Sequence, residues 1–159
     1  MRVYRIEREK YLETTLKGFG TATAEAYRRN SLNTYLVYTA ESRTLAILEV
    51  SVHLDFSEDL PTDRYYVEMD IPDEIEILEL KTKDLPSNWD THPPSLETQY
   101  IGDDFVKNNE AAVLKMASCI VPLKYNFLIN LKHFGAKRIT VVARKQLTFD
   151  KRFKKVELQ

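Results

Sequence analysis

The sequence has few glycines, one cysteine and no long apolar run, and each shortage excludes a class of protein. The four glycines, at positions 18, 20, 102 and 135, form neither a G-x-G-x-x-G nor a G-x-x-x-x-G-K-[ST] loop, which excludes a classical dinucleotide fold and a P-loop. Cys119 stands alone, so no internal disulfide forms, which fits a reducing compartment. No stretch approaches the ~20 apolar residues of a membrane helix. The start, MRVYRIEREK, does not resemble a signal peptide, and we therefore expect a cytoplasmic protein without membrane contact.

Charge and histidine content exclude two further classes. The net charge is −1, from 23 basic and 24 acidic residues, so no bulk attraction draws the chain to nucleic acid, and we expect no direct nucleic-acid binding. His53, His92 and His133 are far apart and show no zinc spacing with Cys119, so no metal is expected. Cys119 lies between apolar neighbours, which favours an inert core thiol over a nucleophile.

The length of 159 residues and the hydrophobic share of 43% predict a single globular domain over residues 1–159. Alternating or apolar segments bounded by turns predict strands at 2–6, 35–39, 64–72, 74–80, 118–122, 126–130 and 138–150. A helix is expected after Ser42, with Leu45, Leu48 and Val52 at helical spacing, and another over 102–117, capped by Asp103 or Asp104. The proline-rich segment 81–99 carries Trp89 and predicts an ordered loop. This order favours an α+β fold with mostly antiparallel strands.

Four polar residues around the expected helix and strands require separate comment. Glu49 stands inside the apolar helix that follows Ser42, where packing alone does not call for an acid. Taken singly, each residue has an ordinary structural interpretation. Glu49 would lie on the solvent face of an amphipathic helix, Tyr38 in a strand core, Arg28 in a solvated loop, and Ser118 at the start of a strand.

The spacing of these residues resembles the RES-domain family, the toxins of Xre–RES toxin–antitoxin systems that consume NAD. The family pattern runs G-R-W-N, then V-Y-T-[AS]-x-S at the end of a strand, then a helix with A-x-x-E and a histidine. The matching residues here are Arg28, Asn30, Val37, Tyr38, Thr39, Ala40, Ser42, Ala46, Glu49 and His53. Tyr38 lies ten positions after Arg28, and Glu49 lies eleven positions after Tyr38, as in the family.

Later segments extend the resemblance over nearly the whole chain. LPSNWDTHPP, TQYIGDDF and SCIVPLKYNFLINLKH each resemble a family element in the same order, and the last contains Ser118, Asn126, Asn130 and His133. Phe149, Asp150 and Arg152 resemble a closing F-x-x-D-x-R, although Phe149 here stands directly before Asp150. Departures occur at Tyr27 in place of glycine, Arg29 in place of tryptophan, and Ala117 and Leu131 in place of prolines. Arg29 is therefore a rival for the role of Arg28.

The resemblance implies an ADP-ribosyltransferase-like fold, a split and mostly antiparallel sheet with flanking helices, and NAD as a substrate. Glu49 would then stabilise the positive charge that develops as the nicotinamide–ribose bond breaks, while Arg28 clamps the diphosphate. Tyr38 would stack on nicotinamide, and Ser118 would bind its amide or orient Glu49. Asn30 is a further candidate NAD-binding residue. Possible supporting residues are Ser42, His53, Asn130 and His133.

The resemblance also implies partners. The chain would be neutralised by a cognate Xre-like helix-turn-helix antitoxin, and the resemblance also suggests a homodimer of the toxin in that complex. Two alternatives keep the fold but change the function. One is a transferase that attaches ADP-ribose to a protein target, and the other is a catalytically inactive interaction module whose site is closed by Tyr27 and Arg29.

Overall fold

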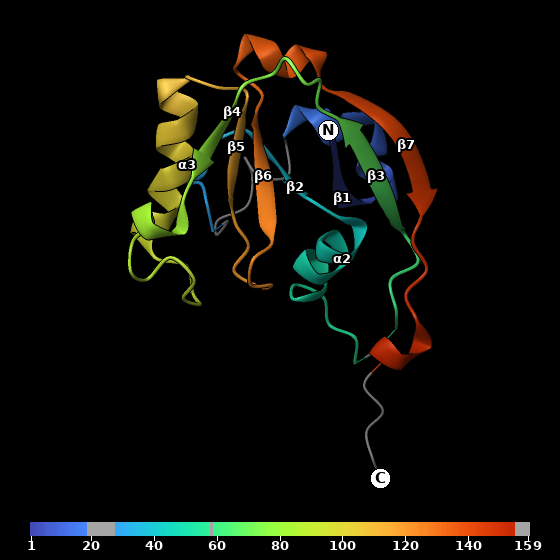
Figure 1. Ribbon diagram of the computed structural model, residues 1–159. Coiled ribbons are helices and arrows are strands. Elements are labelled where there is room, and N and C mark those ends of the chain that lie inside the picture. Colours follow the sequence, from blue (N-terminus) through green and yellow to red (C-terminus); the bar gives the residue numbers. More distant parts are fainter. Residues whose placement is uncertain (19–27, 58, 155–159) are drawn as a thin grey trace.

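The computed structural model describes residues 1–18, 28–57 and 59–154, and it has the expected α+β architecture (Figure 1). The predicted strands at 2–6, 35–39, 64–72, 74–80, 126–130 and 138–150 are confirmed with shifted bounds. In chain order the elements are β1 (Arg2–Arg8), η1 (Glu9–Lys17), β2 (Leu36–Ala40), α2 (Arg43–Ser51), β3 (Arg64–Asp70), β4 (Ile77–Leu80), η2 (Thr82–Asp84), α3 (Leu96–Asn108), β5 (Val113–Ala117), β6 (Tyr125–Asn130), η3 (Phe134–Arg138), β7 (Thr140–Gln146) and η4 (Lys151–Phe153).

The described strands form one sheet in the order β4-β5-β6-β2-β1-β3-β7, and all neighbours are antiparallel except β4 and β5. The predicted split of the sheet lies between β1 and β2. These two strands pair only at Tyr4 and Ala40, whereas β1 pairs with β3 along its whole length. The two halves therefore diverge from a single point of contact, and α2 lies between them (Figure 1).

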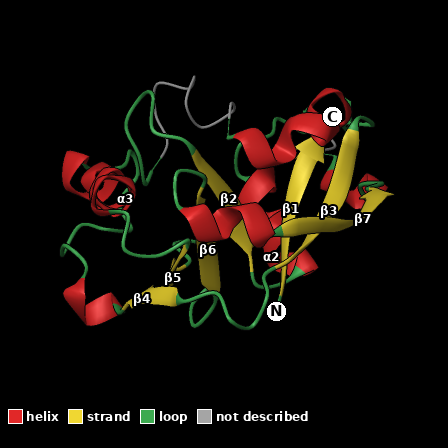
Figure 2. Ribbon diagram, turned by 90° about the horizontal axis from the view of Figure 1, so that it is seen from above, coloured by secondary structure: helices red, strands yellow, loops and turns green. Residues whose placement is uncertain are grey.

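Alternation along the strands places two apolar clusters on opposite faces of the sheet. Leu36, Leu114 and Leu128 belong to a cluster with Phe105 of α3. The neighbouring strand residues, such as Ile129, belong to a cluster that includes residues of η3 on the other face. Figure 2 shows the two helices well apart from each other, with α3 at the left edge of the molecule and α2 near its middle.

Helix α2 begins as predicted, because the Ser42 hydroxyl accepts a hydrogen bond from the Leu45 backbone N–H at 3.1 Å. Of the three apolar residues at helical spacing, only Leu45 is buried; Leu48 and Val52 are exposed. The helix packs through Leu45 and Ala46 onto Ala40 of β2. This narrow contact fixes α2 at the point where the two halves of the sheet meet.

Two predicted elements are wrong. The helix expected over 102–117 begins earlier, capped by Ser95 rather than Asp103 or Asp104. It ends at Asn108, where the C-cap residue Asn109 has a left-handed backbone. The segment from Val113 to Ala117 is strand β5, because its position between β4 and β6 overrides a helix-favouring composition. The strand expected at 118–122 is instead the turn between β5 and β6.

The part of the chain that the structure describes holds no helix long and apolar enough to cross a membrane. The segment that follows β1 forms the 3-10 helix η1 (Glu9–Lys17). Tyr27, one of the departures from the family pattern, lies outside the described residues.

Candidate functional site

Glu49 lies near the end of α2, and its carboxylate is held through one oxygen. Its Oε1 accepts hydrogen bonds from the Ser118 hydroxyl at 2.8 Å and from Nδ2 of Asn126 at 2.7 Å. Ser118 directly follows β5 and Asn126 lies on β6, so both donors come from the sheet. Since both bonds end on Oε1, they fix the carboxylate without occupying Oε2.

The Ser118 hydroxyl is itself fixed by the turn that follows β5. Its Oγ accepts hydrogen bonds from the backbone N–H groups of Ile120, at 3.0 Å, and Val121, at 3.2 Å. The Ser118 N–H donates to the Lys124 carbonyl at 2.8 Å and closes the turn. With its lone pairs engaged by the turn, the hydroxyl hydrogen is directed at Glu49.

Tyr38 lies on β2, and its hydroxyl contacts the segment 28–30. It donates to Oδ1 of Asn30 at 2.6 Å and accepts from the Arg29 backbone N–H at 3.2 Å. Asn30 is buried, and its Nδ2 donates to the Ser31 carbonyl at 2.9 Å. Asn30 therefore acts on the position of Tyr38, and the two predicted residues are brought together.

The two adjacent arginines have different surroundings. Arg28 is half-buried, and its Nη1 donates to the carbonyls of Trp89, at 3.3 Å, and Thr91, at 2.6 Å. Arg29 is only 3% exposed. Its Nη2 donates to the Ala117 carbonyl at 3.3 Å and to Sγ of Cys119 at 3.0 Å. Arg28 thus contacts the loop 85–95, and Arg29 reaches the residues on either side of Ser118.

Burial sets the electrostatics around Arg29. Loss of solvent lowers the pKa of the Arg29 guanidinium below its usual value. Burial raises the pKa of the Cys119 thiol, and the charges of Arg29 and Arg28 oppose that rise. The ring of Trp89 lies against the guanidinium, with its centroid 5.4 Å from Cζ of Arg29. Cys119, expected to be an inert core thiol, is instead half-buried and in contact with Arg29, whereas the loop that carries Trp89 is ordered as expected.

The supporting residues suggested by the sequence lie elsewhere in the fold. Ser42 caps α2, and His53 is exposed just beyond the end of that helix. Asn130 is at the opposite end of β6 from Asn126 and donates to Oδ1 of Asn109 at 2.9 Å. His133 caps η3, where its Nδ1 accepts from the Gly135 N–H at 3.1 Å. None of these contacts involves Glu49 or Tyr38.

Asn126, Trp89 and Cys119 are not among the site residues predicted from sequence, although all three lie against site residues. A signal for Asn126 was present. It is an amide in the otherwise apolar strand NFLIN, just as Glu49 is an acid in an apolar helix. Its alternation with Leu128 places it on the sheet face that α3 covers.

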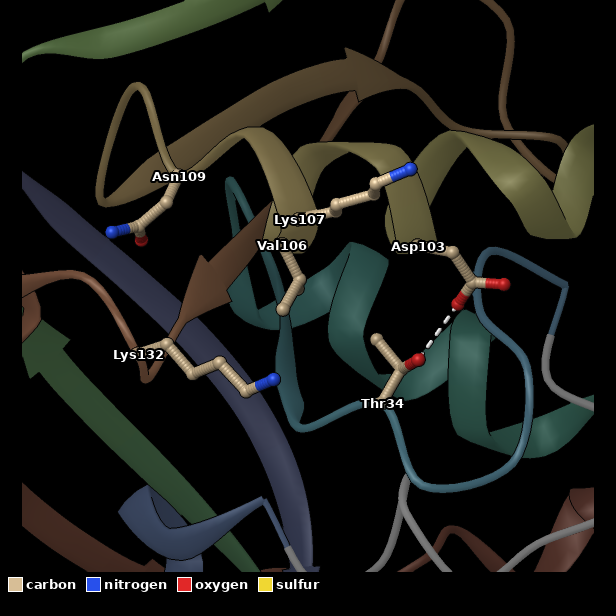
Figure 3. A pocket seen from close by; sticks show the side chains of 6 residues that line it. All are labelled: Thr34, Asp103, Val106, Lys107, Asn109 and Lys132. Atoms are coloured by element: carbon tan, nitrogen blue, oxygen red, sulfur yellow. Dashed lines mark hydrogen bonds between the residues drawn. The ribbon is translucent and has the colours of Figure 1, made fainter.

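A cavity of about 460 Å³ lies beside α3 and β2, lined by Thr34, Asp103, Val106, Lys107, Asn109 and Lys132 (Figure 3). It contains none of the predicted catalytic residues. Asp103, expected to cap a helix, accepts hydrogen bonds from Thr34 Oγ1 at 2.7 Å and the Ser31 N–H at 2.9 Å. These bonds tie α3 to the segment that carries Asn30. Among the described residues, no group of histidine, cysteine, aspartate and glutamate side chains is arranged to hold a metal ion.

Comparisons with known proteins match this chain to one family model, the RES domain, over residues 2–151. A "Prs ADP-ribosylating toxin" of Sphingobium sp. is 37% identical over 89% of this chain and 88% of its own length. A protein named "Toxin Res" from Photorhabdus laumondii is 36% identical over 99% of both chains. A chain in the crystal structure of the M. tuberculosis MbcT–MbcA toxin–antitoxin complex superposes with a TM-score of 0.72, at 13% identity. That alignment covers 92% of this chain and 84% of the other, and it supports the fold.

Proposed function

The chain belongs to the RES domain family, and on that premise we propose that it is the toxin of a toxin–antitoxin pair that cleaves NAD at the nicotinamide–ribose bond. The observation that carries the proposal is the pair of hydrogen bonds that holds the Glu49 carboxylate. Two neutral donors hold Oε1 at 2.8 and 2.7 Å, and this leaves the charge of the carboxylate available at Oε2.

Cleavage of the nicotinamide–ribose bond passes through a state with positive charge on the ribose, as glycoside hydrolysis does. Nicotinamide leaves from a cationic pyridinium ring, so no acid has to protonate it. A single fixed carboxylate that opposes the developing charge and binds ribose hydroxyls meets the chemical need. Glu49 has this role in the proposal. Ser118 and Asn126 are its positioning residues, because both donate to the oxygen that does not face the ribose.

The remaining predicted site residues act on binding. Arg28 presents guanidinium N–H groups other than Nη1 to the diphosphate, while Nη1 holds the loop that carries Trp89. Tyr38 offers its ring to nicotinamide, with its hydroxyl fixed by Asn30. NAD is the substrate in this proposal, and no step needs a metal.

A second candidate function is transfer of ADP-ribose to a protein. The name of the Sphingobium relative, 37% identical to this chain, favours it. Both functions break the same bond and use Glu49 in the same way. They differ in the group that accepts ADP-ribose: water or phosphate in the first case, and a protein side chain in the second.

The proposed partner is an Xre-like helix-turn-helix antitoxin that covers Glu49 and its surroundings. The toxin–antitoxin complex among the structural neighbours supports a partner of this general kind. A homodimer of the toxin within the complex remains a prediction. A purified complex that cleaves NAD as fast as the toxin alone would contradict direct blocking of the site.

The test is incubation of the purified protein with NAD, with and without phosphate or candidate protein acceptors, followed by product analysis. We expect free nicotinamide together with ADP-ribose, its phosphorylated form or a modified protein. Glu49→Gln is the inactive variant, and Glu76→Gln, at an exposed acid outside the site, is its matched control. Release of no nicotinamide under any condition by folded protein would leave the inactive interaction module as the better interpretation.

A further inference from the structure

Unpaired buried polar atoms are concentrated in the candidate site. Within the described residues, three buried side-chain atoms have no hydrogen-bond partner: Nε of Arg5, Nη1 of Arg29 and Oδ1 of Asn126. Two of the three belong to residues that contact Ser118, its neighbours or Glu49. A buried donor without an acceptor costs stability, so such a group calls for an explanation.

The charge of Arg29 is also unbalanced. Other well-buried arginines in the described part of the chain have a carboxylate partner: Arg5 pairs with Glu7, and Arg64 pairs with Asp63. Arg29 is more buried than either, at 3% exposure, yet no ion pair within 4 Å is formed by it among the described residues. Its acceptors are a carbonyl and a thiol. A buried guanidinium without a counter-charge is a costly arrangement, and a bound anion would relieve it.

We propose that Arg29 binds a phosphate-class oxyanion through Nη1, next to Glu49 and Ser118. The planar fork of a guanidinium matches the geometry of phosphate oxygens, and Nη1 is the arm of that fork left unpaired. Arg28 keeps only its N–H groups other than Nη1 for such a ligand, because its Nη1 already donates to two carbonyls. The inference deepens the proposed function and rests on it for the position of NAD.

Phosphate chemistry at this place can come from two sources. One is the diphosphate of NAD, bound across the site while Glu49 acts on the ribose. The other is free phosphate, which would accept ADP-ribose in place of water. In either case the oxyanion binds at Nη1, while Nη2 donates to Cys119 Sγ and the Trp89 ring lies 5.4 Å from Cζ of the same guanidinium. Trp89 is the sole tryptophan of the chain, so its fluorescence reports binding directly.

The experiment is a fluorescence titration of the purified protein with sodium phosphate and, separately, with ADP-ribose, which keeps the diphosphate but cannot react. Sodium chloride is used to hold the ionic strength constant. We expect a saturable change for at least one ligand, and a loss of affinity of about tenfold or more in Arg29→Gln. The matched control is Arg138→Gln, an exposed arginine paired with Glu74. It should bind as wild type does.

The two titrations, with ADP-ribose and with phosphate, identify the source of the oxyanion. An Arg29→Gln effect on ADP-ribose alone assigns the oxyanion to the dinucleotide, and an effect on phosphate alone assigns it to a free phosphate. Arg29→Lys, which keeps the charge but loses the fork, should bind with intermediate affinity and serves if the glutamine variant does not fold. Wild-type affinity in a folded variant, or no saturable change in wild type, would overturn the proposal. Nicotinamide release by wild type, measured separately, shows whether the proposed function itself fails.

Discussion

The carboxylate end of the site (Glu49, Ser118 and Asn126) and the arginine end (Arg28, Arg29 and Trp89) are built in opposite ways. At the carboxylate end, the turn after β5 and strand β6 each supply one hydrogen bond to the same oxygen of Glu49, although Oδ1 of Asn126 is buried there without a partner. At the arginine end, the segment 28–30 and the loop 85–95 meet outside the helices and strands, and a buried donor is left unpaired. The group proposed for chemistry is thus fixed in advance, whereas the groups proposed for binding lie on loops with interactions still to make.

The largest effect should come from removing the charge at the carboxylate end. Glu49→Gln keeps an oxygen that can accept from Ser118 and Asn126, so the fold should persist. Because the charge opposes a state that exists only as the bond breaks, we expect turnover to fall by about 100-fold or more, with a smaller change in the Michaelis constant. Steady-state NAD cleavage measures this, beside a thermal melt. Near-normal turnover in folded protein would remove Glu49 from the mechanism.

The next largest effect should come from a substitution that displaces the backbone of Arg29 at the arginine end. A Cβ added at Gly102 of α3 would lie 1.7 Å from the Arg29 carbonyl oxygen, and backbone at that distance has to move. We expect Gly102→Ala to cost about 2–3 kcal/mol in the free energy of unfolding, as overpacking does, and to raise the Michaelis constant. Urea unfolding and steady-state kinetics provide the two measurements.

Gly135→Ala is the comparison for that variant. The nearest atom to its added Cβ is Nδ1 of the His133 side chain, at 3.1 Å, which is better able to yield. Its cost in stability should therefore be smaller, with kinetics unchanged. Equal costs for the two variants, or wild-type kinetics in Gly102→Ala, would mean that α3 does not position the arginine end.

A smaller effect should come from taking one donor away from the carboxylate end. Asn126→Ala removes the 2.7 Å bond to Glu49 but leaves the bond from Ser118. We expect turnover to fall about tenfold, equivalent to roughly 1.4 kcal/mol, because hydrogen bonds to charged groups are among the stronger ones. The Michaelis constant should stay nearly constant. Asn108→Ala, at an exposed amide, is the control, and equal kinetics in the two variants would show that Ser118 suffices alone.

The sequence predicts the fold well where local pattern and tertiary position agree. The alternation in β3 and the Ser42 cap of α2 are examples. It fails from Val113 to Val121, where a helix-favouring run is strand β5 and an apolar run is a turn. Residues 113–117 form a strand because β5 pairs with a neighbouring strand on each side. The residues after it form a turn because the Ser118 hydroxyl accepts hydrogen bonds from two backbone N–H groups there.

The candidate site likewise has one part that the sequence reveals and another that it does not. Glu49 is detectable because an acid inside an apolar helix has no packing explanation. The role of Ser118 beside Glu49 follows only from the family resemblance, and the local sequence does not reveal the role of Asn126. The two residues are 69 and 77 positions from Glu49 along the chain, and the pairing of β5 with β6 brings them together. The contrast between Arg28 and Arg29 is likewise invisible in sequence, since burial rather than residue type separates them.

The smallest effect should come from Cys119, whose thiol is one of two weak acceptors at Nη2 of Arg29. Cys119→Ser keeps an acceptor in place, so turnover and the Michaelis constant should change by no more than about threefold.

The Cys119 thiol also allows a test based on its pKa. Burial raises its pKa, so the reactive thiolate should form only at higher pH than in a free thiol. Alkylation by iodoacetamide, followed by intact mass at this single cysteine, should be slower in folded than in urea-unfolded protein at pH 8. Equal rates in the two states would mean that the arginine end opens freely without ligand, and the contrast with the carboxylate end would then be one of mobility as well as of bonding.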